Sequence, residues 1–302
     1  MKFTIYQSSR IGGRRYNQDR IAYSYSRDAL LMVLADGMGG HLNGEVAAQF
    51  AVQLISESFE RHAKPKLKKP QLFLEYAFEN AHRAILSYAS NHRLQDTPRT
   101  TCVACIVQDD VAYWAHAGDS RLYLFRGAKL VTRTRDHSKL QDMLDNGSIS
   151  QKQAAVHPER NKVYNCLGGS APPEVELSGK TRMRHGDTFL LCSDGLWSPL
   201  SDNEILAVVS GYPVIQAVQR LIEKAESRAG EKSDNISAIG MMWSVDSTAA
   251  PDFEVSTQTM PATAFTTRIS GFDSTHETPA VTDEEIEQAI AEIRDTIGKY
   301  SK

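Results

Sequence analysis

The spacing of hydrophobic residues along the chain changes several times and predicts the order of its elements. Three short apolar runs open the sequence, at about residues 3–6, 21–25 and 30–35, and predict strands. Apolar residues then recur every three or four positions from Glu45 to about Arg61, and again over about residues 71–93. This period is typical of two helices that each bury one face, and Asn43 suits the N-cap of the first.

The pattern changes again after residue 100, where apolar residues alternate with polar ones or run continuously. TCVACIVQDD, VAYWAHAGD, SRLYLFRGAK and LVTRT predict strands joined by tight turns, which require antiparallel pairing. Residues 136–179 are mixed, with a short helix near Leu140. DTFLLCSDG and NISAIGMMW predict two more strands, with helices at about 202–209 and 214–229 between them.

These elements predict an α+β fold. Two antiparallel sheets packed face to face, each covered by helices on its outer side, would bury every apolar face of the predicted strands and helices. We therefore expect a four-layer α-β-β-α sandwich. It would be complete with the last strand of this series, which ends near residue 244.

The composition changes near Asp246, and the rest of the chain is rich in Ser, Thr, Pro and Ala. Residues 245–281 lack the regular apolar spacing of a core and predict a linker. Residues 282–302 predict an amphipathic C-terminal helix with an isoleucine stripe. We expect it to be regulatory and to dock on the preceding domain, on a second copy or on a partner. The alternative is a frayed helix at the end of a disordered tail.

The overall composition narrows the class of protein. The 302 residues carry a formal net charge of −3, so the chain has no basic footprint for nucleic acid. No stretch approaches the ~18 consecutive apolar residues of a membrane span, and the N-terminus lacks the pattern of a signal peptide. We expect a soluble, cytoplasmic protein with no membrane partner. Cys102 and Cys105 form a C-x-x-C, but residues three apart on a strand face opposite sides, so we expect core residues.

Four acidic residues stand at the ends of predicted strands, each beside Gly, Ser or Asn. They are Asp36, Asp119, Asp194 and Asp234. One Asp-Gly pair is a common turn dipeptide, but the pattern recurs here. Crowded carboxylates repel one another unless cations intervene, and a set of oxygen ligands selects Mg²⁺ or Mn²⁺ over zinc. Gly37 leaves the backbone beside Asp36 accessible, so its carbonyl can also reach a metal.

A pair of arginines lies near the N-terminus, in GGRRYNQDR. Ordinary surface charge is one interpretation of Arg14 and Arg15. The functional interpretation is a guanidinium held against an oxyanion, because arginine binds phosphate oxygens bidentately.

Six stretches of the chain together resemble a known family. RRYNQD, LADGMGGHLNGE, AHAGDSRLYLFR, TRDHS, LCSDGLW and SDNISAIG occur in the order seen in type 2C metal-dependent protein phosphatases of the bacterial branch. The resemblance covers about residues 1–244, which we expect to form one phosphatase domain. It implies the same α-β-β-α sandwich, a binuclear Mg²⁺ or Mn²⁺ centre between the sheets, and a mobile flap at about residues 136–179.

The resemblance also implies roles for the acidic residues. Asp36 would bridge both cations, Asp194 and Asp234 would hold one of them, and the Gly37 carbonyl would hold the other. Asp36 and Asp194 are therefore the expected catalytic carboxylates. Asp119 matches a residue that holds a weaker third cation together with Asp194.

The implied reaction is hydrolysis of phosphoserine and phosphothreonine in proteins by a metal-activated water, with Arg14 matching the phosphate-binding arginine. The implied partners are a phosphorylated protein substrate and a cognate serine/threonine kinase that the enzyme opposes. Two competing hypotheses are a catalytically silent pseudophosphatase that binds phosphoproteins, and an interaction protein that acts through its tail. The first should have lost metal carboxylates, and all four are present.

Two positions depart from the family pattern. Gln18 stands where some members have Glu, so support of the second cation through water would be neutral here. Met38 stands where the eukaryotic branch has a histidine that protonates the leaving oxygen. His41 is nearby, but a place in a loop explains it equally well, so the general acid stays open.

Overall fold

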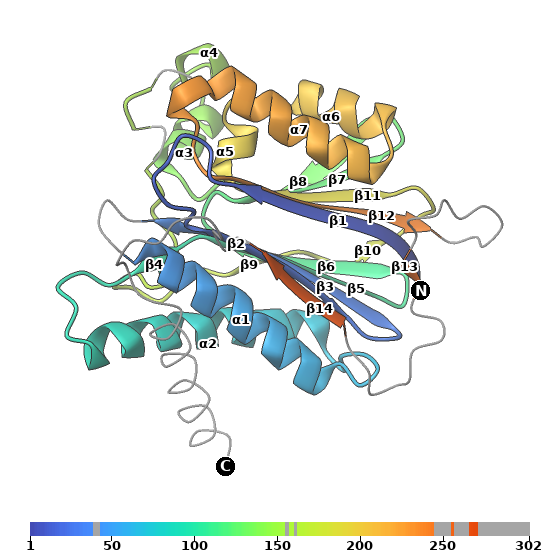
Figure 1. The fold of residues 1–302 in the computed structure, drawn as a ribbon, viewed down its shortest axis with the longest axis horizontal. Helices are drawn as coiled ribbons and strands as arrows, with labels where there is room; N and C mark the ends of the chain where they lie inside the picture. Colours follow the sequence, from blue (N-terminus) through green and yellow to red (C-terminus); the bar gives the residue numbers. More distant parts are fainter. Residues whose placement is uncertain (39–42, 155–156, 160–161, 245–254, 257–265, 271–302) are drawn as a thin grey trace.

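Two antiparallel β-sheets face each other in the middle of the molecule, and helices cover their outer faces (Figure 1). This computed structural model describes residues 1–38, 43–154, 157–159, 162–244, 255–256 and 266–270. The predicted α+β sandwich of four layers is confirmed. None of the helices within these ranges is both long and apolar enough to cross a bilayer.

The first sheet contains the strands in the order β13-β1-β12-β11-β7-β8. Their bounds are β1 Lys2–Arg10, β7 Arg121–Arg126, β8 Lys129–Arg133, β11 Thr188–Cys192, β12 Ile236–Ser244 and β13 Val255–Ser256. The second sheet has the order β10-β6-β5-β3-β2-β14, with β4 paired to β3 and β9 paired to β6. Their bounds are β2 Asp19–Tyr25, β3 Ala29–Met38, β4 Arg99–Thr100, β5 Cys102–Gln108, β6 Val111–Ala117, β9 Glu176–Leu177, β10 Thr181–Arg182 and β14 Thr266–Ser270.

The helices lie on the two outer faces (Figure 1). Two long helices, α1 Gly44–His62 and α2 Pro70–Asn91, cover the second sheet. The first sheet is covered by α5 Asp194–Trp197, α6 Asp202–Gly211 and α7 Val214–Ala229, with the short η1 Gly230–Lys232 after α7. Two short helices, α3 Lys139–Asp145 and α4 Gln151–Ala154, lie in the predicted flap region.

Buried apolar side chains form three layers that match this arrangement. Phe3, Met32 and Ile239 belong to the layer between the two sheets, and the other two layers lie under the helices on each side. In strand β5, side chains that alternate between the two faces of the sheet contribute to two different layers. Cys102 faces α1 and α2, whereas Cys105 faces the opposite sheet, so the prediction of two core cysteines is confirmed.

Two local predictions are amended by the structure. Asn43 is the N-cap residue of α1, as predicted, but it has a φ of 124° and its side chain makes no capping hydrogen bond. Its backbone carbonyl instead accepts from the amide of Val46 at 3.1 Å. The strand that was expected to end at Asp36 continues to Met38, because β4 pairs with its last two residues. Asp36 therefore lies inside a paired strand, which fixes its backbone more firmly than a turn would.

The predicted linker contains two strands that its sequence pattern did not indicate. β13 pairs with β1 at the edge of the first sheet, and β14 pairs over five residues with β2 at the edge of the second. The rest of the predicted linker and the predicted helix over 282–302, with Ile286, Ile290, Ile293 and Ile297, lie outside the described residues.

Because β14 covers the edge of β2, we expect a chain that ends at Ser244 to associate with itself. An uncovered strand edge is a template for pairing with another chain. The matched control ends at Ser270 and keeps both β13 and β14. Light scattering after size exclusion should show larger species only for the shorter chain. Identical masses and melting temperatures for the two chains would contradict this role of the strands.

Candidate metal centre

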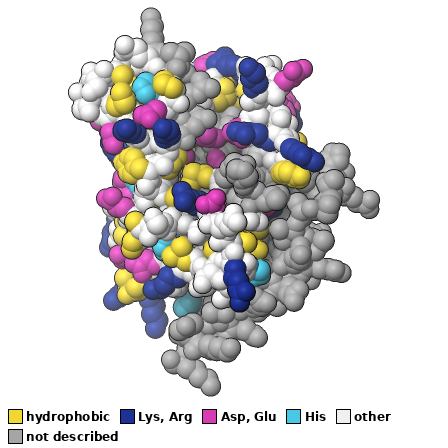
Figure 2. Space-filling view, turned by 90° about the vertical axis from the view of Figure 1, so that its left-hand side faces the viewer, with side chains coloured by type: hydrophobic (Ala, Val, Ile, Leu, Met, Phe, Trp, Pro, Cys, Tyr) yellow, Lys and Arg dark blue, Asp and Glu magenta, His cyan; other side chains and the backbone are white. Residues whose placement is uncertain are grey.

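The predicted acidic residues come together at one end of the sandwich. Asp36 lies on β3, Asp119 follows β6, Asp194 begins α5, and Asp234 precedes β12. Asp119, Asp194 and Asp234 all lie close enough to Asp36 to raise its pKa. Figure 2 views this end of the molecule, where acidic and basic side chains lie beside one another.

Strand β3 holds Asp36 by its backbone. The Asp36 carbonyl accepts from the Thr101 amide at 2.9 Å and from Thr100 Oγ1 at 2.8 Å, and its amide donates to Thr101 Oγ1 at 3.2 Å. The next residue must be glycine, because a Cβ on Gly37 would lie 2.3 Å from the carbonyl oxygen of Gly44. The close approach of α1 to β3 thus constrains the Gly37 backbone directly beside Asp36.

One carboxylate of the site, Asp19, was not predicted. It is fully buried and lies directly opposite Asp36 in the β2–β3 register. Ser193 Oγ donates to Asp19 Oδ2 at 2.8 Å, whereas the buried Oδ1 has no hydrogen-bond partner. Its place in RRYNQD, directly after Gln18, is the sequence signal that could have revealed it. The neighbouring Gln18 donates from Nε2 to Glu45 Oε2 at 3.1 Å.

A one-turn helix presents Asp194. Ser193 precedes it and is buried, and its Oγ accepts from the Ser237 amide at 3.0 Å. A Cβ on Gly195 would lie 2.1 Å from the carbonyl oxygen of Asn235, so this turn packs directly on the start of β12. The same contact brings Asp194 beside Asp234, which precedes Asn235 in the chain.

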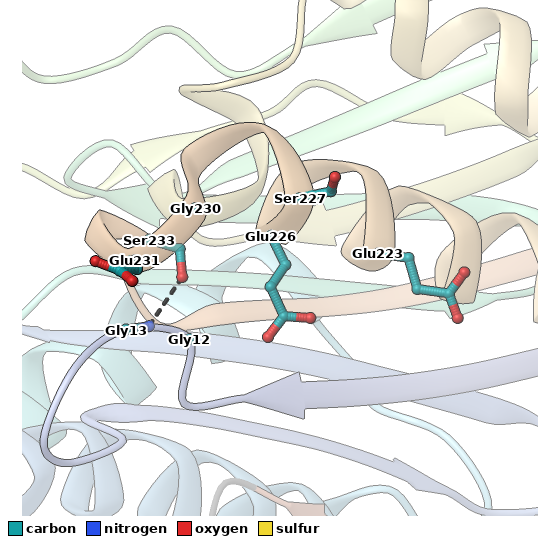
Figure 3. Close-up of a pocket in the computed structure, with 8 residues that line it drawn as sticks. All are labelled: Gly12, Gly13, Glu223, Glu226, Ser227, Gly230, Glu231 and Ser233. Carbon is teal, nitrogen blue, oxygen red and sulfur yellow. Dashed lines mark hydrogen bonds between the residues drawn. The ribbon is translucent and has the colours of Figure 1, made fainter.

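Arg14 reaches the acidic cluster from the loop after β1. Its Nη2 lies 2.5 Å from Asp234 Oδ2, and its side chain is 57% exposed, so its remaining donors face solvent. The preceding Gly13 donates its amide to Ser233 Oγ at 2.9 Å (Figure 3). This bond anchors the loop beside an open pocket, which Glu223 and Glu226 of α7 also line. The structure therefore places Arg14 at the carboxylates rather than on a remote surface.

Asp119 occupies the turn between β6 and β7 and is 4% exposed. Its backbone carbonyl accepts from Trp197 Nε1 at 2.9 Å. Gly118 before it has a φ of 113°, a backbone conformation that glycine adopts without steric cost. The next charged residue, Arg121, makes a bidentate ion pair with Asp136 at 2.8 and 2.7 Å.

The carboxylates raise one another's pKa. Burial, followed by the charges of neighbouring carboxylates, raises the pKa of Asp36 and of Asp194 well above the usual range. Burial raises the pKa of Asp119 to about 7, with a further contribution from Asp136. Burial also raises the pKa of Asp19 to about 6, although hydrogen bonds from serines oppose the change. In the absence of cations the cluster therefore disfavours its own ionised form.

The donor set at this end of the sandwich fits hard divalent cations. It offers carboxylate oxygens, one of them the unpartnered Asp19 Oδ1, together with the Gly37 backbone. Cations would offset the mutual repulsion that raises these pKa values. No histidine or cysteine within the described residues takes part in this set. His41, the nearby histidine of the sequence, lies outside the described residues.

A second group has residue types that could suit zinc. His116, His137 and Glu176 offer ligand atoms within 4.8 Å of one another. However, His137 Nδ1 accepts from the Gly118 amide at 3.2 Å, so the neutral ring carries its proton on Nε2, which lies 3.1 Å from Glu176 Oε2. The His116 and His137 rings are stacked with centroids 4.5 Å apart, so their lone pairs do not converge. These hydrogen bonds favour a fixed histidine pair over a metal site.

Comparison with known proteins shows the family of this chain. Residues 7–233 match the model of the family described as protein phosphatase 2C. The serine/threonine phosphatase stp of Listeria monocytogenes is 31% identical over 229 residues, which are 75% of this chain and 90% of that protein. The chain therefore belongs to the protein phosphatase 2C family. The predicted enzyme class, a serine/threonine protein phosphatase, is confirmed by this membership.

Solved structures show the same fold. The serine/threonine phosphatase of S. agalactiae superposes with a TM-score of 0.72 at 29% identity, covering 80% of this chain and 99% of that one. The catalytic domain of the phosphatase PstP, in complex with two manganese ions, has a TM-score of 0.68 at 29% identity, covering 80% and 98%.

Proposed function

We propose that this protein hydrolyses phosphoserine and phosphothreonine esters in proteins with the help of two bound Mg²⁺ or Mn²⁺ ions. The observation that carries this proposal is the convergence of buried carboxylates on one end of the sandwich, with Arg14 beside them. The manganese ions in the PstP structure, a similar fold, support it.

The roles we propose follow the positions of the residues. Asp36 would bridge the two cations, with Asp194 and Asp234 on one and the Gly37 carbonyl on the other. When bound, such cations lower the pKa of water and stabilise charge on phosphoryl oxygens. A third, weaker cation would be held by Asp119 and Asp194.

The protein's own residues position the phosphate. The partly exposed Arg14 guanidinium keeps donors free beyond its bond to Asp234, and these would bind phosphoryl oxygens as their charge increases. A cysteine nucleophile has no support, because burial raises the pKa of all four thiols. We therefore propose attack by water, without a covalent phosphoenzyme.

We further propose that the substrate is a phosphoprotein modified by a cognate serine/threonine kinase, in the cytoplasm. In this proposal residues 136–179 form a flap beside the site, and the tail beyond residue 244 acts as a linker and docking element. The described elements of these segments are α3, α4 and β9 in the proposed flap and the edge strands β13 and β14 in the tail.

The test of this function is the metal requirement of the full chain. We expect turnover of p-nitrophenyl phosphate and of a phosphothreonine peptide to fall by at least about 100-fold in excess EDTA, because the cations supply several kcal/mol of charge stabilisation. Added Mn²⁺ or Mg²⁺ should restore it. Full activity in EDTA would refute the metal mechanism. Binding of the phosphopeptide without hydrolysis, at any metal concentration, would instead favour the pseudophosphatase.

A further inference from the structure

Trp197 connects two of the acidic residues through its own position in the fold. It is the last residue of α5, the helix that begins with Asp194. Its indole Nε1 donates to the backbone carbonyl of Asp119 at 2.9 Å. Residues three apart on a helical turn lie on the same side, so one rigid turn holds the Asp194 carboxylate and the donor to Asp119.

The indole ring is itself held in place. The guanidinium of Arg121 lies 3.6 Å from the centroid of the Trp197 ring. Arg121 is in turn fixed by its two bonds to Asp136 and by a bond from Nη1 to Tyr123 Oη at 2.9 Å. Rotation of the ring would break the stacking on a buried, ion-paired arginine, so its N–H stays directed at Asp119.

Asp119 depends on such support because of its local backbone. It lies in a turn between β6 and β7, outside the ladder hydrogen bonds of either strand. The Gly118 before it has a φ of 113°, and a Cβ there would lie 2.6 Å from Thr101 Cβ. The close approach of the turn to Thr101 therefore requires glycine at this position. The indole bond ties this turn, which joins β6 of the second sheet to β7 of the first, to α5 in the helical layer over the first sheet.

We propose that Trp197 is a positioning residue that sets Asp119 against Asp194, so that both carboxylates can hold one third cation. The inference rests on the proposed function, in which these two residues share that cation. The proposal predicts that loss of the bond affects the third cation and not the other two. The bond from Trp197 reaches Asp119, and neither Asp36 nor Asp234 takes part in it.

Trp197→Phe tests this proposal, since phenylalanine keeps an aromatic ring for Arg121 to stack on and has no N–H donor. Mn²⁺ binding to the metal-stripped full chain would be measured by titration calorimetry. For the unchanged protein we expect two tighter sites and one weaker site. In Trp197→Phe the weaker site should lose about tenfold in affinity, as is typical when a group that orients a metal ligand is removed. The tighter sites should keep theirs.

Two further variants serve as controls for this measurement. Asp119→Ala should remove the weaker site and provides the reference for its complete loss. Trp114→Phe makes the same exchange on β6 in the layer between the sheets, and should leave all Mn²⁺ affinities unchanged.

Equal Mn²⁺ affinities at every site in Trp197→Phe and in the unchanged protein would overturn the proposal. A uniform loss at all sites together with a lower melting temperature would also overturn it, because Trp197 would then serve general packing. If the unchanged protein hydrolyses phosphoesters with only two Mn²⁺ sites, this inference fails while the proposed function stands. Absence of Mn²⁺ binding and of activity would refute the proposed function itself.

Discussion

Asp36→Asn is expected to lower the turnover of p-nitrophenyl phosphate by at least about 10²–10³-fold at saturating Mn²⁺, the scale of loss when a preorganised electrostatic group is removed. Asparagine has nearly the same size, and the backbone bonds from Thr100 and Thr101 do not involve the side chain. The exchange therefore removes the negative charge that would bridge the two cations.

The same variant should change how Mn²⁺ affects stability. Cations that bind only the folded protein raise its melting temperature, so a weakened centre gives a smaller rise. Without metal, Asp36→Asn should melt no lower than the unchanged protein, because it removes a carboxylate whose pKa is raised by burial and repulsion.

The control for Asp36→Asn is Asp28→Asn, at the opposite end of the same β2–β3 hairpin. Asp28 pairs with Arg27 at 3.0 Å and its side chain is 36% exposed. It should keep full turnover and the full response to Mn²⁺. Turnover of Asp36→Asn within a few-fold of this control would remove Asp36 from the proposed centre.

Asp136→Asn is expected to cause the largest loss of stability, about 3 kcal/mol in the free energy of unfolding, measured by urea denaturation at fixed Mn²⁺. Its bidentate partner Arg121 is buried, with 9% of its side chain exposed, and would be left without its closest counter-charge. The nearest remaining carboxylate is Asp202, whose oxygen lies 3.7 Å from Arg121 Nη1 and which is partly exposed.

Asp109→Asn provides the matched exchange on the surface. Asp109 pairs with Lys66 at 2.7 Å, and both side chains are about half exposed. Exposed pairs of this kind contribute only about 0–1 kcal/mol, because solvent screens them. Equal losses for the two variants would mean that burial of the Arg121–Asp136 pair does not govern its contribution.

The helices and core strands could be predicted from the sequence because their signals are local. The three-to-four spacing placed one helix at 214–229, and α7 spans Val214–Ala229. The alternation around Cys102 and Cys105 placed them on opposite faces of a strand, which β5 confirms. Such patterns depend only on the period of a helix or strand and on which faces must be buried.

The strands of the tail could not be predicted in this way. Thr266–Ser270 has no apolar alternation, and its strand exists because the edge of β2 offers unpaired backbone groups. That edge is defined only once β2, β3 and β5 have assembled. An edge strand of this kind is specified by its partner rather than by its own side chains.

The residues of the candidate site were likewise predicted only in part. The sequence by itself determined the two sheets with their covering helices, and it indicated Asp36, Asp119, Asp194 and Asp234 through their places beside apolar strands. Only the tertiary structure brought in Asp19, which is buried because the β2–β3 register sets it opposite Asp36, and the bond from Trp197 to Asp119. Local periodicity fixes which faces are buried, but register and the packing of α5 against the turn between the two sheets depend on contacts distant in the chain.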